Sequence, residues 1–463
     1  MGALADLSAV DLAAAIRSRK VSPVEAVRAA LDRIREREDL NAFVTVDEAQ
    51  VLSDAKAAEI AVMSGGRLGP LHGVPVSVKD LINTAGLRTT FGSALFEHNV
   101  PVSDAVSVAR TRAAGGIILG KTTTPEFGHK PLTQAPIFGR TLSPIDPALT
   151  CGGSSGGAAV AVATGMGPLA IGSDGGGSVR IPAACCGVVG LKATLGTIPH
   201  LQVPDLFGAN SFVGPMARAV ADTKLLFEAL AGPDRRDPYG QGIADSPDVA
   251  VEPRGLRIAW LPRCGNVLDP EVERVTTSAV RRLEEAGAVV EPVELDFVAL
   301  EPTFLVILES TLASRVGDKL PQWRDRLDAS LVKTVETGLA HSAVTLHAAM
   351  AARTALFGRI QDLFDRFDLL VSPVLSAPPL PADQDPHGRV VIDGRDAGTI
   401  RGAWYPYTYP FNLTGHPALA QPCGTTQQRL PVGLQLVGRW HSDRTLLALG
   451  GWLEQALGPG TRI

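Results

Sequence analysis

Cysteine is scarce in this 463-residue chain, which contains five cysteines, none of them in a CxxC pair. The nine histidines include no HExxH pattern or similar spacing. Both observations argue against a metal site, because protein zinc sites are built from such closely spaced ligands. We therefore expect neither a metal nor another cofactor. The odd, sparse set of cysteines fits a reducing cytoplasm, in which buried thiols stay unpaired.

An excess of basic residues is also absent, since the formal net charge is −5. Nucleic acids and anionic membrane surfaces attract clusters of Lys and Arg, so neither is an expected partner. The N-terminus has no basic region followed by an apolar one, so no signal peptide is indicated. The longest stretch without charge or histidine, residues 147–173, carries seven glycines and two prolines. That composition favours a buried helix between loops over a membrane span, and we expect a cytoplasmic protein.

Glycine and serine are abundant in one stretch, residues 150–178, which reads TCGGSSGGAAVAVATGMGPLAIGSDGGGS. Its serines at 154, 155 and 178 are embedded in glycine, and an apolar segment long enough for a helix separates the pair from the third. Glycine permits sharp turns and lets backbone N–H groups point at a ligand. A serine at the end of such a run lies where main-chain amides surround an oxyanion. The pattern predicts a nucleophilic serine.

No histidine lies near these serines, so a base must come from elsewhere in the chain. The apolar segment VPVSV at 74–78 reads as a buried strand that ends at Lys79. Burial disfavours the charged form of lysine and lowers its pKa. A fall of roughly three units from about 10.4 would make it a base near neutrality. Taken alone, Lys79 reads more simply as a surface lysine at a strand end.

The combination resembles the amidase signature family. Ser154 follows Lys79 by 75 positions, and Ser178 follows Ser154 by 24. The flanking segments that agree with the family run from residue 69 to 439 and are GPLHGVPVSVKDLINTAG, AAGGIILGKTTTPEFGHK, GGSSGG, GSDGGGSVRIPAACCGVVGLK, YPFNLTGHPALAQPCG and LPVGLQLVGR. A lone GGSSGG is typical of any flexible loop, whereas all these blocks in this order are a specific signal.

The resemblance implies a triad of Ser178 as nucleophile, Ser154 as a bridging serine after a cis peptide bond, and Lys79 as base. It also implies an oxyanion hole made of four main-chain amides, those of Gly175, Gly176, Gly177 and Ser178. Three further residues are expected to support this site, Ser155 by hydrogen bonding and Asp174 and Arg180 by holding the loop. The implied activity is hydrolysis of a small-molecule amide to acid and amine through an acyl-enzyme, with esters and carbamates as further candidate substrates.

Two alternatives remain. The first is the amidotransferase A subunit, which acts as a glutaminase and releases ammonia inside a tRNA-dependent complex. That protein usually carries a glycine- and tyrosine-rich helix start with basic residues, whereas residues 328–340 read DASLVKTVETGLA. The second is a P-loop nucleotide site, because GGIILGKT at 115–122 matches GxxxxGK[ST]. The apolar run 117–119 and Pro125 disfavour it, since they fit a strand better than a phosphate loop opening a helix.

Alternating strand and helix patterns predict an α/β fold, one large α/β/α sandwich domain with a mixed central sheet covered by helices on both faces. We divide the chain into N-terminal helices (1–66), a catalytic core (67–232), an inserted β-α-β and helical section (233–365) and the C-terminal part of the core (366–463). Residues 304–308, Trp323 and the proline-rich loop 373–386 are expected to line the acyl pocket. A homodimer is the default expectation for such an enzyme.

Overall fold

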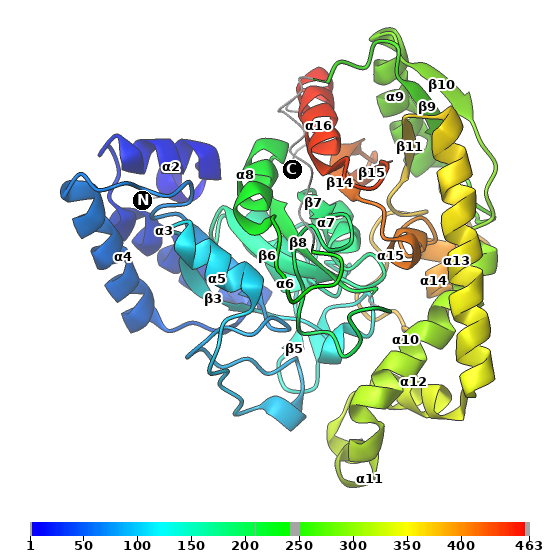
Figure 1. Ribbon diagram of the computed structural model, residues 1–463, viewed down its shortest axis with the longest axis horizontal. Coiled ribbons are helices and arrows are strands. Elements are labelled where there is room, and N and C mark those ends of the chain that lie inside the picture. The colour runs from blue at the N-terminus through cyan, green and yellow to red at the C-terminus, as the bar shows by residue number, and fades with distance from the viewer. Residues whose placement is uncertain (1, 209, 241–250, 459–463) are drawn as a thin grey trace.

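The structure is a computed structural model that describes residues 2–208, 210–240 and 251–458, and its centre is one large sheet (Figure 1). The eleven strands of this sheet, in chain order, are β1 (Phe43–Thr45), β2 (Pro75–Lys79), β3 (Ile117–Thr122), β6 (Leu169–Asp174), β7 (Val189–Lys192), β8 (Phe212–Ala217), β9 (Arg257–Trp260), β10 (Val289–Pro292), β11 (Leu369–Pro373), β14 (Ala418–Thr425) and β15 (Pro431–Val437). Their spatial order is β1-β3-β2-β6-β8-β7-β14-β15-β11-β9-β10. Two small hairpins stand apart, β4 (Gln134–Ala135) with β5 (Gly139–Arg140), and β12 (Arg389–Ile392) with β13 (Arg395–Thr399).

The α-helices of the described residues are α1 (Gly2–Ala5), α2 (Ala9–Arg17), α3 (Pro23–Glu36), α4 (Glu48–Met63), α5 (Val106–Ala113), α6 (Gly156–Ala163), α7 (Arg180–Cys186), α8 (Val220–Leu230), α9 (Pro270–Glu285), α10 (Glu301–Val316), α11 (Leu320–Trp323), α12 (Ala329–Ala340), α13 (Ala343–Arg366), α14 (Ile400–Trp404), α15 (Pro410–Thr414) and α16 (Asp443–Leu457). None of these helices is both long enough and apolar enough to cross a lipid bilayer.

The sheet is mixed, as the sequence predicts. β2 pairs in parallel with both β3 and β6, and β9 pairs in parallel with β10 and β11. The strands between these two parallel groups, from β6 through β8, β7, β14 and β15 to β11, pair antiparallel, as does the edge strand β1 with β3. The parallel pair of β2 and β3 is joined through α5, which is the crossover that a parallel connection requires.

Side chains alternate between the two faces of the sheet. In β6, Leu169 and Ile171 belong to one hydrophobic cluster and Ala170 belongs to the other. Helices α6 and α7 contribute to the cluster on the Ala170 side, and α2, α8, α9 and α16 contribute to the cluster on the opposite side. Because successive strand residues point to opposite faces, both faces of the sheet are covered by helices. This confirms the predicted fold class.

The N-terminal helices follow the sequence signals closely. The Ser22 hydroxyl accepts the Val24 N–H at 3.0 Å, and the Glu25 carboxylate accepts the Ser22 N–H at 2.9 Å. This reciprocal capping box starts α3 at Pro23, where the missing N–H of proline costs nothing. The sequence Ser22-Pro23-Val24-Glu25 supplies the residue types that such a box requires.

The segment GGIILGKT does not form a phosphate loop. Residues Ile117–Thr122 are strand β3, and the Lys121 ammonium is fully buried, donating to the Ile82 carbonyl and to Thr84 Oγ1. A P-loop lysine has to reach a bound phosphate from the start of a helix. The match to the nucleotide-binding pattern is therefore incidental, and Lys121 has a structural role in the core.

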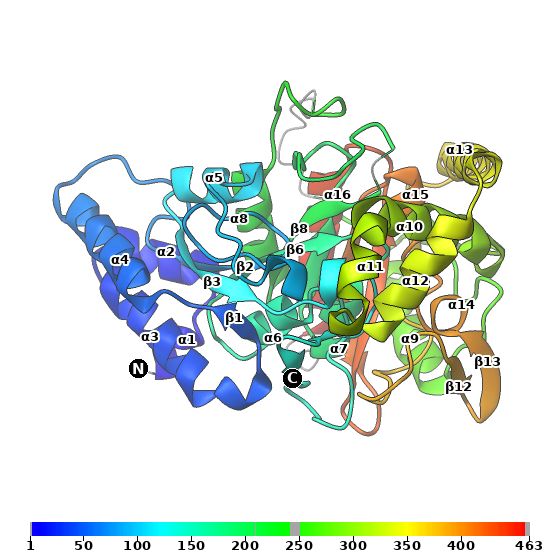
Figure 2. The same cartoon turned by 90° about the horizontal axis from the view of Figure 1, so that it is seen from below.

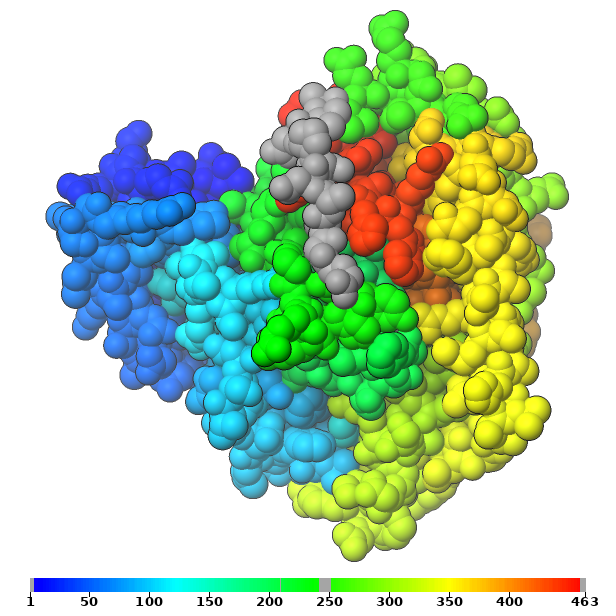
Figure 3. Space-filling model, in the orientation of Figure 1, coloured from blue at the N-terminus to red at the C-terminus, as the bar shows by residue number. Residues whose placement is uncertain are grey.

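A helical layer made of α10, α11, α12 and α13 lies beside the C-terminal half of the sheet (Figure 2). α10 packs against both α12 and α13, and α13 packs against α15. In the space-filling view, α13 forms one margin of the molecule, opposite the N-terminal helices (Figure 3). This layer lies next to the loop that follows β6, where Phe304 of α10 would be 2.6 Å from a Cβ added at Gly176.

Candidate active site

Lys79 ends strand β2, and its side chain is fully buried. Its Nζ lies 2.7 Å from Ser154 Oγ, 2.9 Å from Ser155 Oγ and 3.3 Å from the Ser173 carbonyl oxygen. Burial holds the pKa of Lys79 well below the ordinary lysine value of 10.5, and the negative charge of Asp174 opposes this shift only in part. The neutral amine therefore forms at a lower pH than in an exposed lysine.

Ser154 and Ser155 precede α6 and face Lys79 from the glycine-rich segment. The peptide bond between Gly153 and Ser154 is cis, as the resemblance implies for the bridging serine. Ser155 Oγ donates to the Ser173 carbonyl at 3.1 Å, while it accepts from Lys79. Both hydroxyls thus contact the Lys79 amine, and the Ser155 hydroxyl is also hydrogen-bonded to β6.

Ser178 follows β6 in the loop GGGS, and its side chain is partly exposed. Its carbonyl accepts the Ser155 N–H at 3.1 Å, which ties the two serine segments together. Within the described residues, Ser178 Oγ makes no hydrogen bond, including none to Ser154. The structure brings Lys79, Ser154 and Ser155 into direct contact and ties Ser178 to them through its backbone carbonyl.

The amides of the GGGS loop do not share one role. The Gly177 N–H donates to Asp174 Oδ1 at 2.7 Å, so it is already bound. Among the described residues, the amides of Gly175, Gly176 and Ser178 have no acceptor. The Asp174 carboxylate therefore competes for one of the four amides that the resemblance implies as donors. Three amides remain available to an oxyanion.

A buried ion pair holds this loop. Asp174 Oδ1 lies 2.9 Å from Arg180 Nη2, and both side chains have no exposed surface. Asp174 Oδ2 also accepts the Val179 N–H at 3.1 Å. Burial alone would raise the pKa of Asp174, but the charge and hydrogen bonds of Arg180 hold it below its ordinary value. Asp174 is therefore an ionised structural carboxylate, and both residues bind the loop around Ser178.

Three residues from the C-terminal part of the chain complete these contacts, and sequence reasoning missed all of them. Arg180 Nη1 donates to Gln435 Oε1 and to the Thr408 carbonyl, each at 2.8 Å. Asn412 Oδ1 accepts from Arg180 Nη2 at 2.7 Å. Asn412 and Gln435 belong to the blocks YPFNLTG and LPVGLQLVG, where a polar residue within a buried apolar segment is the only signal of such a role.

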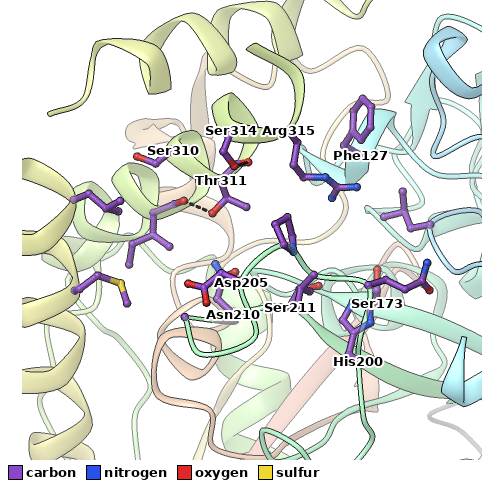
Figure 4. Close-up of a pocket in the computed structure, with 18 of the residues that line it drawn as sticks. Phe127, Ser173, His200, Asp205, Asn210, Ser211, Ser310, Thr311, Ser314 and Arg315 are labelled. Carbon is purple, nitrogen blue, oxygen red and sulfur yellow. Dashed lines mark hydrogen bonds between the residues drawn. The ribbon is translucent and has the colours of Figure 1, made fainter. Parts of the chain in front are cut away.

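A cavity of about 460 Å³ opens beside this site (Figure 4). Its lining includes Ser173, which bonds Lys79 through its carbonyl, and Leu81, just after β2. Most of the rest comes from residues 200–211, which the sequence analysis missed, and from helices α10 and α13. The apolar residues of the lining are Leu81, Phe91, Phe127, Val203, Pro204, Ile307, Leu346 and Met350.

The residues predicted to line an acyl pocket lie in different places in the structure. Ile307, from the predicted segment 304–308, lines the cavity, but Trp323 does not. The proline-rich loop lines a different hollow, which contains Pro378, Pro379 and Pro381. Two backbone hydrogen bonds hold that loop against the segment before Cys151. The Thr150 N–H donates to the Leu380 carbonyl, and the Ala382 N–H donates to the Ala148 carbonyl.

The described residues contain no group of three His, Cys, Asp or Glu side chains that could hold a metal ion. All five cysteines are unpaired and buried. Burial raises the pKa of the Cys151 thiol to about 12, and it also raises the pKa values of Cys185 and Cys186. These thiols therefore pack as small apolar side chains, and none of them is an activated nucleophile.

The chain is similar to known proteins over most of its length. Residues 25–447 match the model of the family described as Amidase. The chain is 38% identical to an acylamidase of Rhodococcus erythropolis, over 95% of this chain and 93% of that protein. It is 33% identical to the A subunit of the glutamyl-tRNA(Gln) amidotransferase of Lachnospira eligens, over 98% of this chain and 99% of that protein.

Among solved structures, a bacterial aryl acylamidase of the amidase signature family superposes with a TM-score of 0.90. It shares 28% sequence identity and covers 97% of this chain and 96% of its own. The family model, the relatives and the fold all extend over nearly the whole chain. The protein belongs to the amidase signature family.

Proposed function

We propose that this protein hydrolyses the C–N bond of a small-molecule amide, with Ser178 as nucleophile, Ser154 as proton relay and Lys79 as base. The observation that carries the proposal is the fully buried Lys79 amine, 2.7 Å from Ser154 Oγ. A buried lysine without a carboxylate in contact is costly to keep charged, and such a group is suited to take up a proton.

The hydrogen bonds around Lys79 fit a neutral amine. Such an amine has two N–H donors and one lone pair. The donors are matched by Ser155 Oγ and the Ser173 carbonyl oxygen. Because Ser155 donates its own proton to Ser173, the Lys79 lone pair is left to accept the proton of Ser154.

In the proposed reaction, Lys79 takes the proton of Ser154 as Ser154 takes the proton of Ser178. Ser178 Oγ then attacks the substrate carbonyl, and the free amides of Gly175, Gly176 and Ser178 stabilise the oxyanion. The relay runs backwards to protonate the departing amine, and water hydrolyses the acyl-enzyme by the same route. The Ser178 hydroxyl has to turn towards Ser154 when substrate binds, since catalytic hydrogen bonds often form only in the complex.

An amidase acting alone is favoured over the amidotransferase glutaminase. The apolar lining of the cavity suits an aryl or alkyl group. Residues 328–340, which form α12 and its N-cap, are the segment in which the amidotransferase subunit usually differs. This segment lacks a glycine- and tyrosine-rich start and has only one basic residue, Lys333. Cytoplasmic location and a homodimer stay predictions, and light scattering on the purified protein would measure the oligomeric state.

The experiment is a hydrolysis assay of the purified chain without partner proteins. Aryl, fatty and small aliphatic amides are compared with glutamine, and product acid and amine are quantified by chromatography. The proposal predicts turnover of at least one aryl or alkyl amide, and of none by the Ser178→Ala variant. Hydrolysis of glutamine alone would instead favour the glutaminase, and no hydrolysis of any amide would contradict the proposal.

A further inference from the structure

The cavity that Ser173 lines also contains an arginine, Arg315, that has no counter-ion within the described residues. Arg315 lies in the last turn of α10, keeps an exposed surface and lines the cavity. Figure 4 shows its side chain extending from α10 into the cavity beside Phe127. Within the described residues, Arg315 forms no ion pair and no hydrogen bond. Its guanidinium carbon lies over the Phe127 ring, 5.3 Å from the centroid.

Arg315 is exposed to solvent on one side, and within the described residues no carboxylate neutralises its charge. Burial lowers the pKa of Arg315 from 12.5, and no neighbouring carboxylate acts to raise it. An arginine remains charged in any protein environment, so a cation faces the cavity. The acidic residue in the lining, Asp205, is engaged elsewhere: it accepts the Phe207 N–H at 3.0 Å and acts on the pKa of Arg353.

Packing against the Phe127 ring does not use the donors of Arg315. A guanidinium above an aromatic face keeps its five N–H groups directed outward, in the plane of the fork. The ring contact and the favourable position of a cation at the C-terminal end of α10 use the charge and the flat face of Arg315, and neither uses its N–H donors. The free donors instead match the two oxygens of a carboxylate, which arginine binds in a bidentate manner.

Arg315 lines a cavity whose wall adjoins the proposed catalytic residues: Ser173, also in the lining, accepts a hydrogen bond from Lys79 through its carbonyl. Phe127 is followed by Gly128, where an added Cβ would lie 3.0 Å from Ser154 Oγ and 2.9 Å from Leu81. His200, also in the lining, has its pKa lowered to about 4 by burial and then by Arg315 and Lys79. Two basic side chains that act on one imidazole lie close to the same wall of the cavity.

We propose that Arg315 is a specificity residue that binds a carboxylate of the substrate. The substrate class is an amide that carries a carboxylate separated from the scissile bond by an apolar spacer. Ile307, Leu346 and Met350 line the cavity with the apolar surface that such a spacer contacts. The inference rests on the proposed amidase function and adds to it the charge of the substrate.

The test uses matched pairs of anilides. In the acyl series, succinyl, glutaryl and adipoyl anilides are compared with anilides whose terminal carboxylate is replaced by the similarly shaped isopropyl group. In the amine series, amides of aminobenzoic acid are compared with those of isopropylaniline. We expect kcat/KM of the wild type to favour the carboxylate in one of the two series by at least tenfold. A preference for the isopropyl member in both series would overturn the inference.

The variants are Arg315→Leu and Arg315→Lys, with Arg366→Leu as the matched control. Arg366 also lies over a phenylalanine ring, 5.1 Å from Phe367, but at the exposed end of α13. Loss of a hydrogen bond to a charged group predicts a fall of about 10- to 100-fold in kcat/KM for the carboxylate substrate in Arg315→Leu. The isopropyl substrate should change by less than about threefold, with partial recovery in Arg315→Lys. Equal losses for both substrates in a folded variant would contradict the proposal.

Binding separates this inference from the proposed catalysis. Calorimetry measures the affinity of the inactive Ser178→Ala variant for the preferred carboxylate substrate and its isopropyl match, with and without Arg315→Leu. We expect carboxylate binding that depends on Arg315. If carboxylate binding does not depend on Arg315 while the wild type hydrolyses neutral amides, the carboxylate site is rejected and the proposed hydrolase stands. Arg315-dependent binding in a protein that cleaves no amide would reject the hydrolase and keep the site.

Discussion

The carboxylate of Asp174 and the guanidinium of Arg180 form an ion pair with no exposed surface, six residues apart, on either side of Ser178. The same carboxylate accepts the amide of Gly177, and the same guanidinium reaches Thr408 and Gln435. The loop that presents the proposed nucleophile is therefore fixed from inside the protein by charge-assisted hydrogen bonds.

The first prediction concerns this ion pair. Arg180→Leu removes one partner and leaves the Asp174 carboxylate buried and uncompensated, which costs about 3–5 kcal/mol. We expect a large fall in the midpoint of thermal unfolding and loss of activity. Arg282→Leu is the control, because Arg282 and Glu285 form an exposed pair on α9 that adds little stability. Similar midpoints for the two variants would show that the pair does not hold the loop.

The second prediction compares two glycines of the GGGS loop. A Cβ added at Gly175 meets no atom within 4 Å, whereas at Gly177 it would lie 2.4 Å from Thr408 Oγ1. Gly177 also has a φ of +124°, which disfavours any other residue. Gly175→Ala should keep stability and at least about a third of the activity, while Gly177→Ala should lose most of both. Thermal unfolding and kcat/KM measure this, and the reverse order would contradict the loop geometry.

The third prediction separates the two serines beside Lys79. Ser154→Ala removes the proposed relay and should lower kcat by about 10²–10⁴-fold. Ser155→Ala removes an acceptor that orients the amine, so we expect a loss nearer tenfold, which is the size of one hydrogen bond. The measurement is kcat on the best amide, with circular dichroism as the check on folding. A larger loss in Ser155→Ala would move the relay to Ser155.

The fourth prediction concerns pH and Glu126, which is buried next to Phe127. Burial raises the pKa of Glu126 from 4.5 to about 7, against the opposing effect of the Asp328 N–H that it accepts. Because its pKa is higher in the folded protein, Glu126 binds its proton more tightly there than in the unfolded chain. The stabilisation of the fold that results is complete below about pH 4.5 and is lost as the pH rises through about 7.

Glu126→Gln carries no titrating group, so its midpoint of thermal unfolding relative to the wild type should rise between pH 5 and pH 8. The neighbouring His129, with its pKa lowered to about 3, and the ion pair of Lys130 with Asp328 are present in both proteins and cancel in the difference. A difference that stays constant with pH would contradict the shift assigned to Glu126.

Much of the fold followed from local patterns. The capping box at Ser22 started α3, and the apolar run before Lys79 became the buried strand β2. The family blocks brought Lys79, Ser154 and Ser178 to attention because glycine, serine and one lysine form an unusual combination. Their spacing in sequence carried no information on which hydroxyl contacts the amine, and Ser155 proved to be as close as Ser154 to within 0.2 Å.

Other features depended on long-range packing. Asn412 of α15 and Gln435 of β15 approach Arg180 from more than 200 positions away, through tertiary packing that no local pattern records. The lining of the cavity by residues 200–211 and Arg315 likewise depends on how α10 lies beside the loop after β6. Trp323 was expected in the pocket because it is an aromatic residue of the helical section. In the structure, the short helix α11 places its ring against the Arg326 guanidinium instead.

The most direct measurement is covalent labelling with an aryl fluorophosphonate near neutral pH, followed by mass spectrometry of the digested protein. The probe transfers its phosphonyl group to an activated serine oxygen and releases fluoride. The account predicts one adduct, on the peptide that contains Ser178, no adduct in Ser178→Ala, and labelling slowed by at least about 100-fold in Lys79→Met. An adduct on another residue, or unchanged labelling in Lys79→Met, would contradict it.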